Sequence, residues 1–239
     1  MSSGSLPESL YIFYFDISSD LAHFRDIFNH SFFRTLLAPP RTTVLGIIGA
    51  MLGYNEEDTI TKLTNIYIGI KILSLNGYAK DIMTAINQKP EGGRTPVMRT
   101  LLVNPSYRIF IGAKDEKQIE YIREGALAPK YPLYLGISDC LAYIKNISSI
   151  SNVNAISANN FNCVIPMATN IGYDYYIKDN NKMIFAPEIV KTVYSFVPTP
   201  KGKKPDRYID LLMFHNCEVK LKKNIRAYPD DAGEPICLI

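Results

Sequence analysis

The sequence predicts an α+β fold, and three observations support this. Of the 239 residues, 47% are hydrophobic and 21% are charged, which is typical of a globular protein and excludes a disordered or collagen-like chain. Over residues 10–147, aromatic and β-branched runs of strand length alternate with two helical patterns. From residue 148 the composition changes to Asn, Ser and short Tyr, Val and Ile runs, which predicts a β-rich region.

The first elements follow from their apolar patterns. Leu10–Ile17 is a run of aromatic and β-branched residues and predicts a buried strand. Arg41–Leu52 carries apolar residues at helical spacing, and Gly53 is a natural C-terminal stop for that helix. Ile66–Leu75 alternates between apolar and other residues, which predicts the second strand before an Asn-Gly turn.

The next segment leaves this regular pattern. Residues 78–95 lack sustained apolar periodicity and predict an excursion from the core. Two strands are expected at Val97–Val103 and Tyr107–Gly112, joined as a hairpin by an Asn-Pro-Ser turn. Asp115 can cap the following helix, with Gln118 as its reciprocal capping partner.

Leu133–Ile147 supplies a further strand. The order of elements is then strand, helix, strand, excursion, two strands, helix, strand. This is the βαββαβ order of a ferredoxin-like (RRM-like) domain with an insertion after its second strand. We therefore expect a ferredoxin-like domain at residues 1–147 and a smaller β-rich C-terminal lobe at residues 148–239, where only Pro187–Tyr194 has a helical pattern.

Charge is unevenly distributed, although the net charge is only +3. Residues 78–114 carry six basic and two acidic side chains, and residues 200–226 carry eight basic and three acidic ones. Such stretches suit surfaces that contact phosphates. They also suit solvated loops, and charge alone leaves both interpretations open.

Several function classes are disfavoured by the sequence. The four cysteines fit no metal or redox spacing, so we interpret them as reduced thiols of a cytoplasmic protein. No apolar window of 18 residues and no export signal occurs, so we expect no membrane association. Phosphate-loop, nucleophile-elbow and zinc-protease motifs are missing, and His23 and His30 lack a third ligand, so we expect neither cofactor nor metal.

Arginine and aromatic residues interleave before the first predicted helix, whose N-terminal N–H groups can meet an anion. We expect RNA contacts there, although ordinary helix capping by a threonine is the alternative. Gly46 and Gly49 superficially match a GXXG nucleic-acid clamp, but we favour close packing of the helix on the sheet as their role. The residues that we expect at this RNA surface are His23, Arg25, Arg34, Arg41, Thr42 and Thr43.

Four segments together resemble a known family. They are Ala22–Arg25, Pro39–Gly53, Arg94–Ile111 and Tyr131–Cys140. In this order they are similar to the CRISPR-associated family-five proteins, which are RAMP-superfamily subunits of type I Cascade surveillance complexes in antiviral defence. The resemblance covers roughly residues 10–145 and does not extend clearly into the C-terminal region.

The resemblance implies a ferredoxin-like domain with a β-hairpin thumb at about residues 78–97. It also implies that the protein binds and caps the 5′ handle of the CRISPR RNA, beside the family-seven backbone subunits and the family-eight large subunit, with only indirect contact to target DNA. The thumb region would then add further RNA-binding cations, namely Lys80, Lys89, Arg94 and Arg99. We expect these cations and those before the first helix to converge in one groove.

One branch of that family cuts precursor CRISPR RNA with a catalytic set that includes an adjacent Lys-His pair. No Lys-His pair occurs in this sequence. We therefore expect a non-catalytic RNA-binding subunit without catalytic residues. The alternative is a metal-independent endoribonuclease in which His23 acts on a 2′-hydroxyl as a general acid or base.

Overall fold

The structure is a computed structural model that describes residues 6–29, 33–86, 92–168, 171–200 and 202–239. The described chain has an α+β fold, as the sequence predicts, in which strands predominate. Its helices are α1 (Arg41–Leu52), α2 (Glu56–Lys62) and α3 (Glu116–Leu127). Gly53 ends α1 in the left-handed conformation, as expected, and the Asp115 side chain caps α3.

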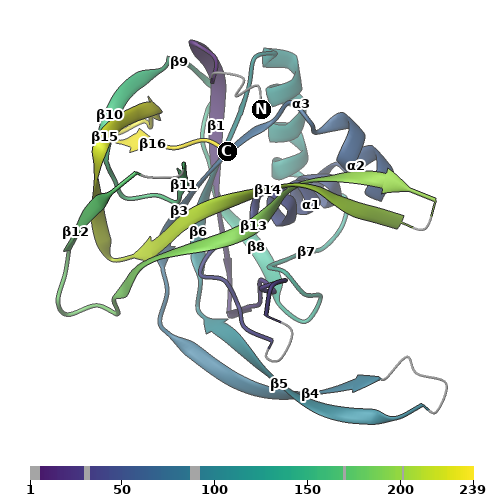
Figure 1. The fold of residues 1–239 in the computed structure, drawn as a ribbon. Coiled ribbons are helices and arrows are strands. Elements are labelled where there is room, and N and C mark those ends of the chain that lie inside the picture. Colours follow the sequence, from purple (N-terminus) through teal and green to yellow (C-terminus); the bar gives the residue numbers. More distant parts are fainter. Residues whose placement is uncertain (1–5, 30–32, 87–91, 169–170, 201) are drawn as a thin grey trace.

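A central antiparallel sheet has the strand order β3-β6-β1-β8-β7, and β9 pairs with the free part of β1. Its strands are β1 (Ser9–Ser19), β3 (Tyr67–Ser74), β6 (Ser106–Ala113), β7 (Leu133–Tyr134), β8 (Leu141–Ile147) and β9 (Ser151–Asn154). The helices lie on one side of this sheet, and part of the C-terminal region lies on the other (Figure 1).

Both faces of the sheet are covered, because successive residues of a strand point to opposite sides. Phe13 of β1 belongs to the main apolar core together with Ile48 of α1 and Ile119 of α3. The neighbouring Ile12 packs in a second cluster with Leu238 near the C-terminus. The part of the C-terminal region around Leu238 therefore occupies the sheet face opposite the helices.

Residues 148–239 are β-rich, as predicted. They form β10 (Ile156–Phe161), β11 (Ile165–Met167), β12 (Tyr173–Ile177), β13 (Phe185–Thr199), β14 (Gly202–His215), β15 (Cys217–Pro229) and β16 (Pro235–Ile236). β13 and β14 pair as a long antiparallel hairpin that crosses α1, and we call it the folded-back hairpin (Figure 1). It positions one side of the candidate site.

A second hairpin extends away from the body, and we call it the projecting hairpin (Figure 1). It consists of β4 (Tyr78–Ile86) and β5 (Arg94–Val103), which pair along their whole length. The short strand β2 (Leu21–Ala22) joins the base of β5 to the body. The excursion predicted for residues 78–95 thus contains the first strand of this hairpin and the start of the second, and residues 87–91 lie outside the described residues.

The predicted pairing of Val97–Val103 with Tyr107–Gly112 is wrong. β5 pairs with β4 and β2, whereas β6 lies between β1 and β3. The turn between β5 and β6 is present, but its backbone groups at Asn104 and Pro105 bond to Asp20 and Ser19 rather than closing a hairpin. A local turn signal indicates where strands end, but it does not determine with which strands they pair.

Three smaller expectations also need correction. Pro187–Tyr194 is not a helix but part of β13, where backbone bonds to β14 outweigh the local pattern. Leu133–Ile147 is divided into two strands around Gly136, which has a φ of +93°. Gln118 does not complete a capping box, because its amide donates to the Lys62 carbonyl at 3.4 Å.

All four cysteines are buried free thiols, as the sequence interpretation expected. None of the helices found in the described ranges is long and apolar enough to cross a membrane.

Candidate nucleic-acid interface

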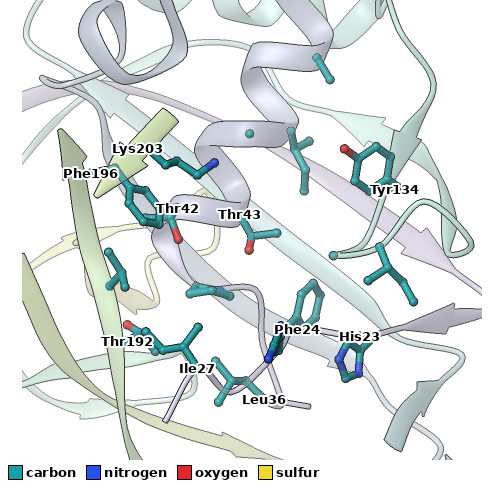
Figure 2. Close-up of a pocket in the computed structure, with 18 of the residues that line it drawn as sticks. His23, Phe24, Ile27, Leu36, Thr42, Thr43, Tyr134, Thr192, Phe196 and Lys203 are labelled. Carbon is teal, nitrogen blue, oxygen red and sulfur yellow. The ribbon is translucent and has the colours of Figure 1, made fainter. Parts of the chain in front are cut away.

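A groove with a volume of about 360 Å³ lies along the N-terminal half of α1, and we call it the cationic groove. Figure 2 shows Thr42 and Thr43 on the first turn of α1, with Phe196 and Lys203 of the folded-back hairpin on one side and Tyr134 on the other. His23 and Phe24 lie beyond the start of the helix. Three parts of the chain that are far apart in sequence therefore form one surface.

The charged side chains that line this groove are all positive. They are Arg25, Lys191 and Lys203, and no carboxylate occurs among the described lining residues. Arg25 stacks over the Phe33 ring at 4.6 Å and, like Lys191, forms no ion pair with a described residue. Lys203 does have a partner, because its Nζ lies 2.7 Å from Oε2 of Glu56 in α2. The groove thus offers positive charge to an anionic ligand.

The first turn of α1 is open toward this groove. Pro40 occupies the N-cap position, and no side chain caps the helix. The capping alternative for Thr42 and Thr43 is therefore wrong, and both threonines line the groove instead (Figure 2). The partial positive charge of a helix N-terminus adds to that of the nearby cations.

His23 lies at the edge of the groove with only 3% of its surface exposed. Its Nδ1 donates to the Thr100 carbonyl at 2.8 Å, which leaves Nε2 unprotonated in the neutral ring. Burial lowers the pKa of His23, and the charges of Arg99 and Arg25 lower it further, against the opposite effect of the Thr100 bond. No group of three or more potential metal ligands forms within the described part of the chain.

Arg41 is not on this surface, although the sequence placed it there. It is 2% exposed, and its guanidinium donates to the carbonyls of Ile66 at 2.9 Å and Tyr194 at 3.2 Å. It also stacks over the Tyr194 ring at 4.5 Å. Arg41 therefore fastens the folded-back hairpin to the body, and we leave it out of the proposed interface.

Arg34 and Arg99 are also engaged within the chain. The guanidinium of Arg34 donates through one nitrogen, Nη2, to both carboxylate oxygens of Glu188 in β13. Arg99 bonds to Asp81 across the projecting hairpin at 2.7 Å and approaches Asp139 at 3.3 Å. These pairs link neighbouring segments, and their carboxylates neutralise charge that the sequence assigned to RNA.

The expected convergence of cations in one groove occurs only in part. His23, Arg25, Thr42 and Thr43 meet there. Lys80 and Arg94 are exposed on the projecting hairpin and do not line the groove. Lys89 and His30 lie outside the described residues. The positive charge that meets Arg25 comes instead from the folded-back hairpin.

Sequence reasoning missed the contribution of that hairpin. Lys191 falls in a segment with a helical pattern, and Lys203 falls in a turn composition that suits a solvated loop. The basic excess of residues 200–226 was the available signal. The sequence could not show where these basic residues lie in the fold, because long-range contacts bring β13 and β14 over α1.

The two glycines of the GXXG step have different roles. A Cβ on Gly49 would lie 2.3 Å from Oγ1 of Thr59 in α2, so Gly49 permits close packing, as expected, although against a helix and not the sheet. A Cβ on Gly46 would meet no atom within 4 Å. Packing therefore does not explain Gly46, which is exposed in the groove.

The described chain is thus an α+β protein with a groove whose charged lining residues are all positive. The chain belongs to the CRISPR-associated protein family Cas_Cas5, because the model of that family matches residues 13–196. This agrees with the resemblance carried by the N-terminal motifs. No curated protein matches the sequence.

Solved structures extend the comparison to nearly the whole chain. A crystal structure of a CRISPR protein from Archaeoglobus fulgidus has a TM-score of 0.55 at 13% identity, covering 95% of this chain and 98% of that chain. A chain of a CRISPR RNA-guided surveillance complex has a TM-score of 0.49 at 10% identity, covering 90% and 91%. The Archaeoglobus fulgidus likeness shows a shared fold that includes the C-terminal region.

Proposed function

We propose that this protein is a non-catalytic subunit of a type I CRISPR Cascade surveillance complex that binds and caps the 5′ handle of the CRISPR RNA. Family membership supports a CRISPR-associated role. The observation that carries the RNA-binding proposal is the cationic groove, whose charged lining residues are all positive. A groove of this kind suits a single strand, because phosphates supply most of the affinity of nucleic acids for proteins.

In this proposal Arg25 and Lys191, which line the groove from different segments of the chain, hold phosphates. The hydroxyls of Thr42 and Thr43 donate to phosphate oxygens on the first turn of α1. Lys203 joins them when it leaves Glu56. The body of the protein corresponds to a ferredoxin-like domain, a proposal that the strand order β3-β6-β1-β8 supports.

The projecting hairpin corresponds to the thumb of this proposal. Ile82, which is 70% exposed, lies opposite Met98 on the neighbouring strand. An exposed apolar pair on an extended hairpin favours contact with another subunit. We propose the family-seven backbone and family-eight large subunits as the protein partners, with target DNA contacted only indirectly.

The proposal includes RNA binding without cleavage, because the chain lacks the Lys-His pair of the cleaving branch. One observation favours the alternative, an endoribonuclease: His23 lines the groove, and its lowered pKa keeps the ring in the neutral form, which can accept a proton. Incubation of the protein with repeat RNA in chelator separates the two. Intact RNA is expected, and site-specific cleavage that His23→Ala abolishes would establish the nuclease instead.

RNA binding itself is tested by the salt dependence of affinity. For single strands the slope of log affinity against log salt falls by about 0.7 for each phosphate contact removed. We expect Arg25→Gln combined with Lys191→Gln to weaken repeat RNA binding and to flatten this slope. Lys80→Gln combined with Arg94→Gln tests whether the projecting hairpin also contacts the RNA.

The matched control is Lys117→Gln combined with Lys223→Gln, which removes the same charge from exposed positions outside the groove. We expect this control to bind RNA with nearly the wild-type slope. Equal flattening in both variants would mean that the groove has no special role and would count against the proposal.

A further inference from the structure

A second cavity, with a volume of about 370 Å³, adjoins the cationic groove. The two cavities share the lining residues Thr42, Gly46, Ala50, Tyr134, Phe196 and Lys203. Tyr54 and Tyr131 extend the aromatic lining of the second cavity. An aromatic cavity therefore adjoins a positively charged one, with α1 running beneath both.

One of the α1 residues that the two cavities share is a glycine, which has no side chain. Gly46 lies in the middle of α1, where glycine is the least favourable residue apart from proline. A Cβ there would touch nothing within 4 Å, so no described part of the chain requires the gap. The helix surface at Gly46 is thus flat and leaves room for a group from outside the described chain.

Aromatic side chains stand on either side of this flat surface. Figure 2 shows Tyr134 and Phe196 on opposite sides of α1, and Tyr134 is 44% exposed. The Lys203 ammonium lies 5.1 Å from the centroid of the Phe196 ring. Unpaired bases stack on aromatic rings of this kind while their phosphates follow a cationic surface.

We infer that the second cavity accepts one unpaired nucleobase of the RNA strand whose phosphates occupy the cationic groove. Gly46 forms the floor of this base site, and Phe196 and Tyr134 form its walls. The inference rests on the proposed function and adds the place where a base is held. An apolar protein side chain fits the shared rim less well, because it brings no negative charge to Lys203 there or to Arg25 and Lys191 in the adjoining groove.

The test adds a side chain to the floor. Gly46→Leu fills the gap, and Gly46→Ala fills it in part while favouring the helix. The full-length protein is titrated with synthetic single-stranded repeat RNAs that carry 2-aminopurine at one position at a time. We expect wild-type protein to quench one position strongly, and Gly46→Leu to abolish that quenching and weaken binding about tenfold. The salt slope should stay unchanged, because the phosphate contacts remain.

Thr61→Leu is the matched control, since it adds a leucine at an exposed, uncharged position of α2 outside both cavities. It should bind and quench like wild type. If Gly46→Leu does not fold, Phe196→Leu and Tyr134→Leu remove the stacking rings instead, and each should reduce the quenching.

Wild-type affinity and quenching in a folded Gly46→Leu protein would overturn the base site. So would an effect of Gly46→Leu on subunit assembly alone, which would identify a protein side chain as the occupant. In both cases the proposed function survives if Arg25→Gln with Lys191→Gln still weakens RNA binding. If wild-type protein binds no RNA, the proposed function fails as well.

Discussion

Two long β-hairpins extend from the body of this protein, and they differ in whether they pack against it. The folded-back hairpin lies across α1, where Tyr194 accepts a hydrogen bond from the buried Arg41 and Lys203 pairs with Glu56. The projecting hairpin extends away from the body (Figure 1). Its Ile82 and Met98 side chains are exposed. One hairpin thus completes a groove of its own chain, and the other presents its surface outward.

The difference indicates that a buried contact to the body, rather than the composition of a hairpin, determines where its basic side chains lie. Both hairpins are antiparallel and carry exposed basic residues. Arg41 bonds the folded-back hairpin to the segment after α2, and this contact brings Lys191 to the same groove as Arg25. No comparable buried cation is found among the described residues of the projecting hairpin, so Lys80 and Arg94 remain on an extended arm.

The largest expected effect comes from removing the anchor. Arg41→Met should lower the free energy of unfolding by about 2–4 kcal/mol, because buried carbonyls that lose their donors cost about 1–3 kcal/mol each. Arg94→Met, on the projecting hairpin, should change it by less than about 0.5 kcal/mol. Urea denaturation measures both values. Similar values for the two variants would contradict the role of Arg41 as an anchor.

The apolar residues of the two hairpins should differ in the same direction. Val193 of β13 is buried, so Val193→Ala should cost about 2 kcal/mol through lost burial and a small cavity. Ile82→Ala, at an exposed position, should cost less than about 0.5 kcal/mol in the isolated protein. Thermal or urea unfolding of both variants tests this. A large loss for Ile82→Ala would mean that the projecting hairpin is packed against the body.

A pH dependence is expected where the two hairpins meet the body. His23 bonds to Thr100 of β5 and lines the groove beside β13. Its pKa is lowered in the folded state relative to the unfolded value of about 6.5. The unfolded chain therefore binds more protons than the folded chain as pH falls through that value, and stability should decrease from pH 7 to pH 5.

His23→Asn removes this titration and should make the decrease in stability smaller. Burial lowers the pKa of His215 as well, so part of the decrease should remain in the variant. The measurement is the free energy of unfolding at several pH values for both proteins. An unchanged slope would show that His23 does not contribute.

Local patterns predicted the individual elements well and their long-range partners poorly. The apolar spacing and Gly53 gave α1 correctly, and alternation gave β3 within one residue at each end. The partner of β5 was missed, because β4 lacks a clear apolar face when it projects into solvent. Pairing depends on contacts between distant residues, which one sequence does not display.

The same reason explains which residues of the candidate site were assigned correctly from the sequence and which were not. Thr42 and Thr43 were found because a helix start is a local signal. Arg41, in the same turn, was misassigned because its burial depends on Tyr194, more than 150 residues later in the chain. The sequence could indicate that Arg34 and Arg99 are cationic, but not that Glu188 and Asp81 already hold them.

The smallest expected effect concerns the ion pair between Lys203 and Glu56 at the groove. Glu56→Gln removes the carboxylate that holds Lys203 and should tighten RNA binding a few-fold at low salt, because Lys203 then becomes available to phosphate. Stability should fall by less than about 1 kcal/mol, since both side chains are exposed. Glu57→Gln is the control, because it makes the same charge change one residue away, and none of the ion pairs between described residues includes Glu57. Equal tightening in both variants would indicate a general charge effect, whereas tightening only in Glu56→Gln would place Lys203 of the folded-back hairpin on the RNA.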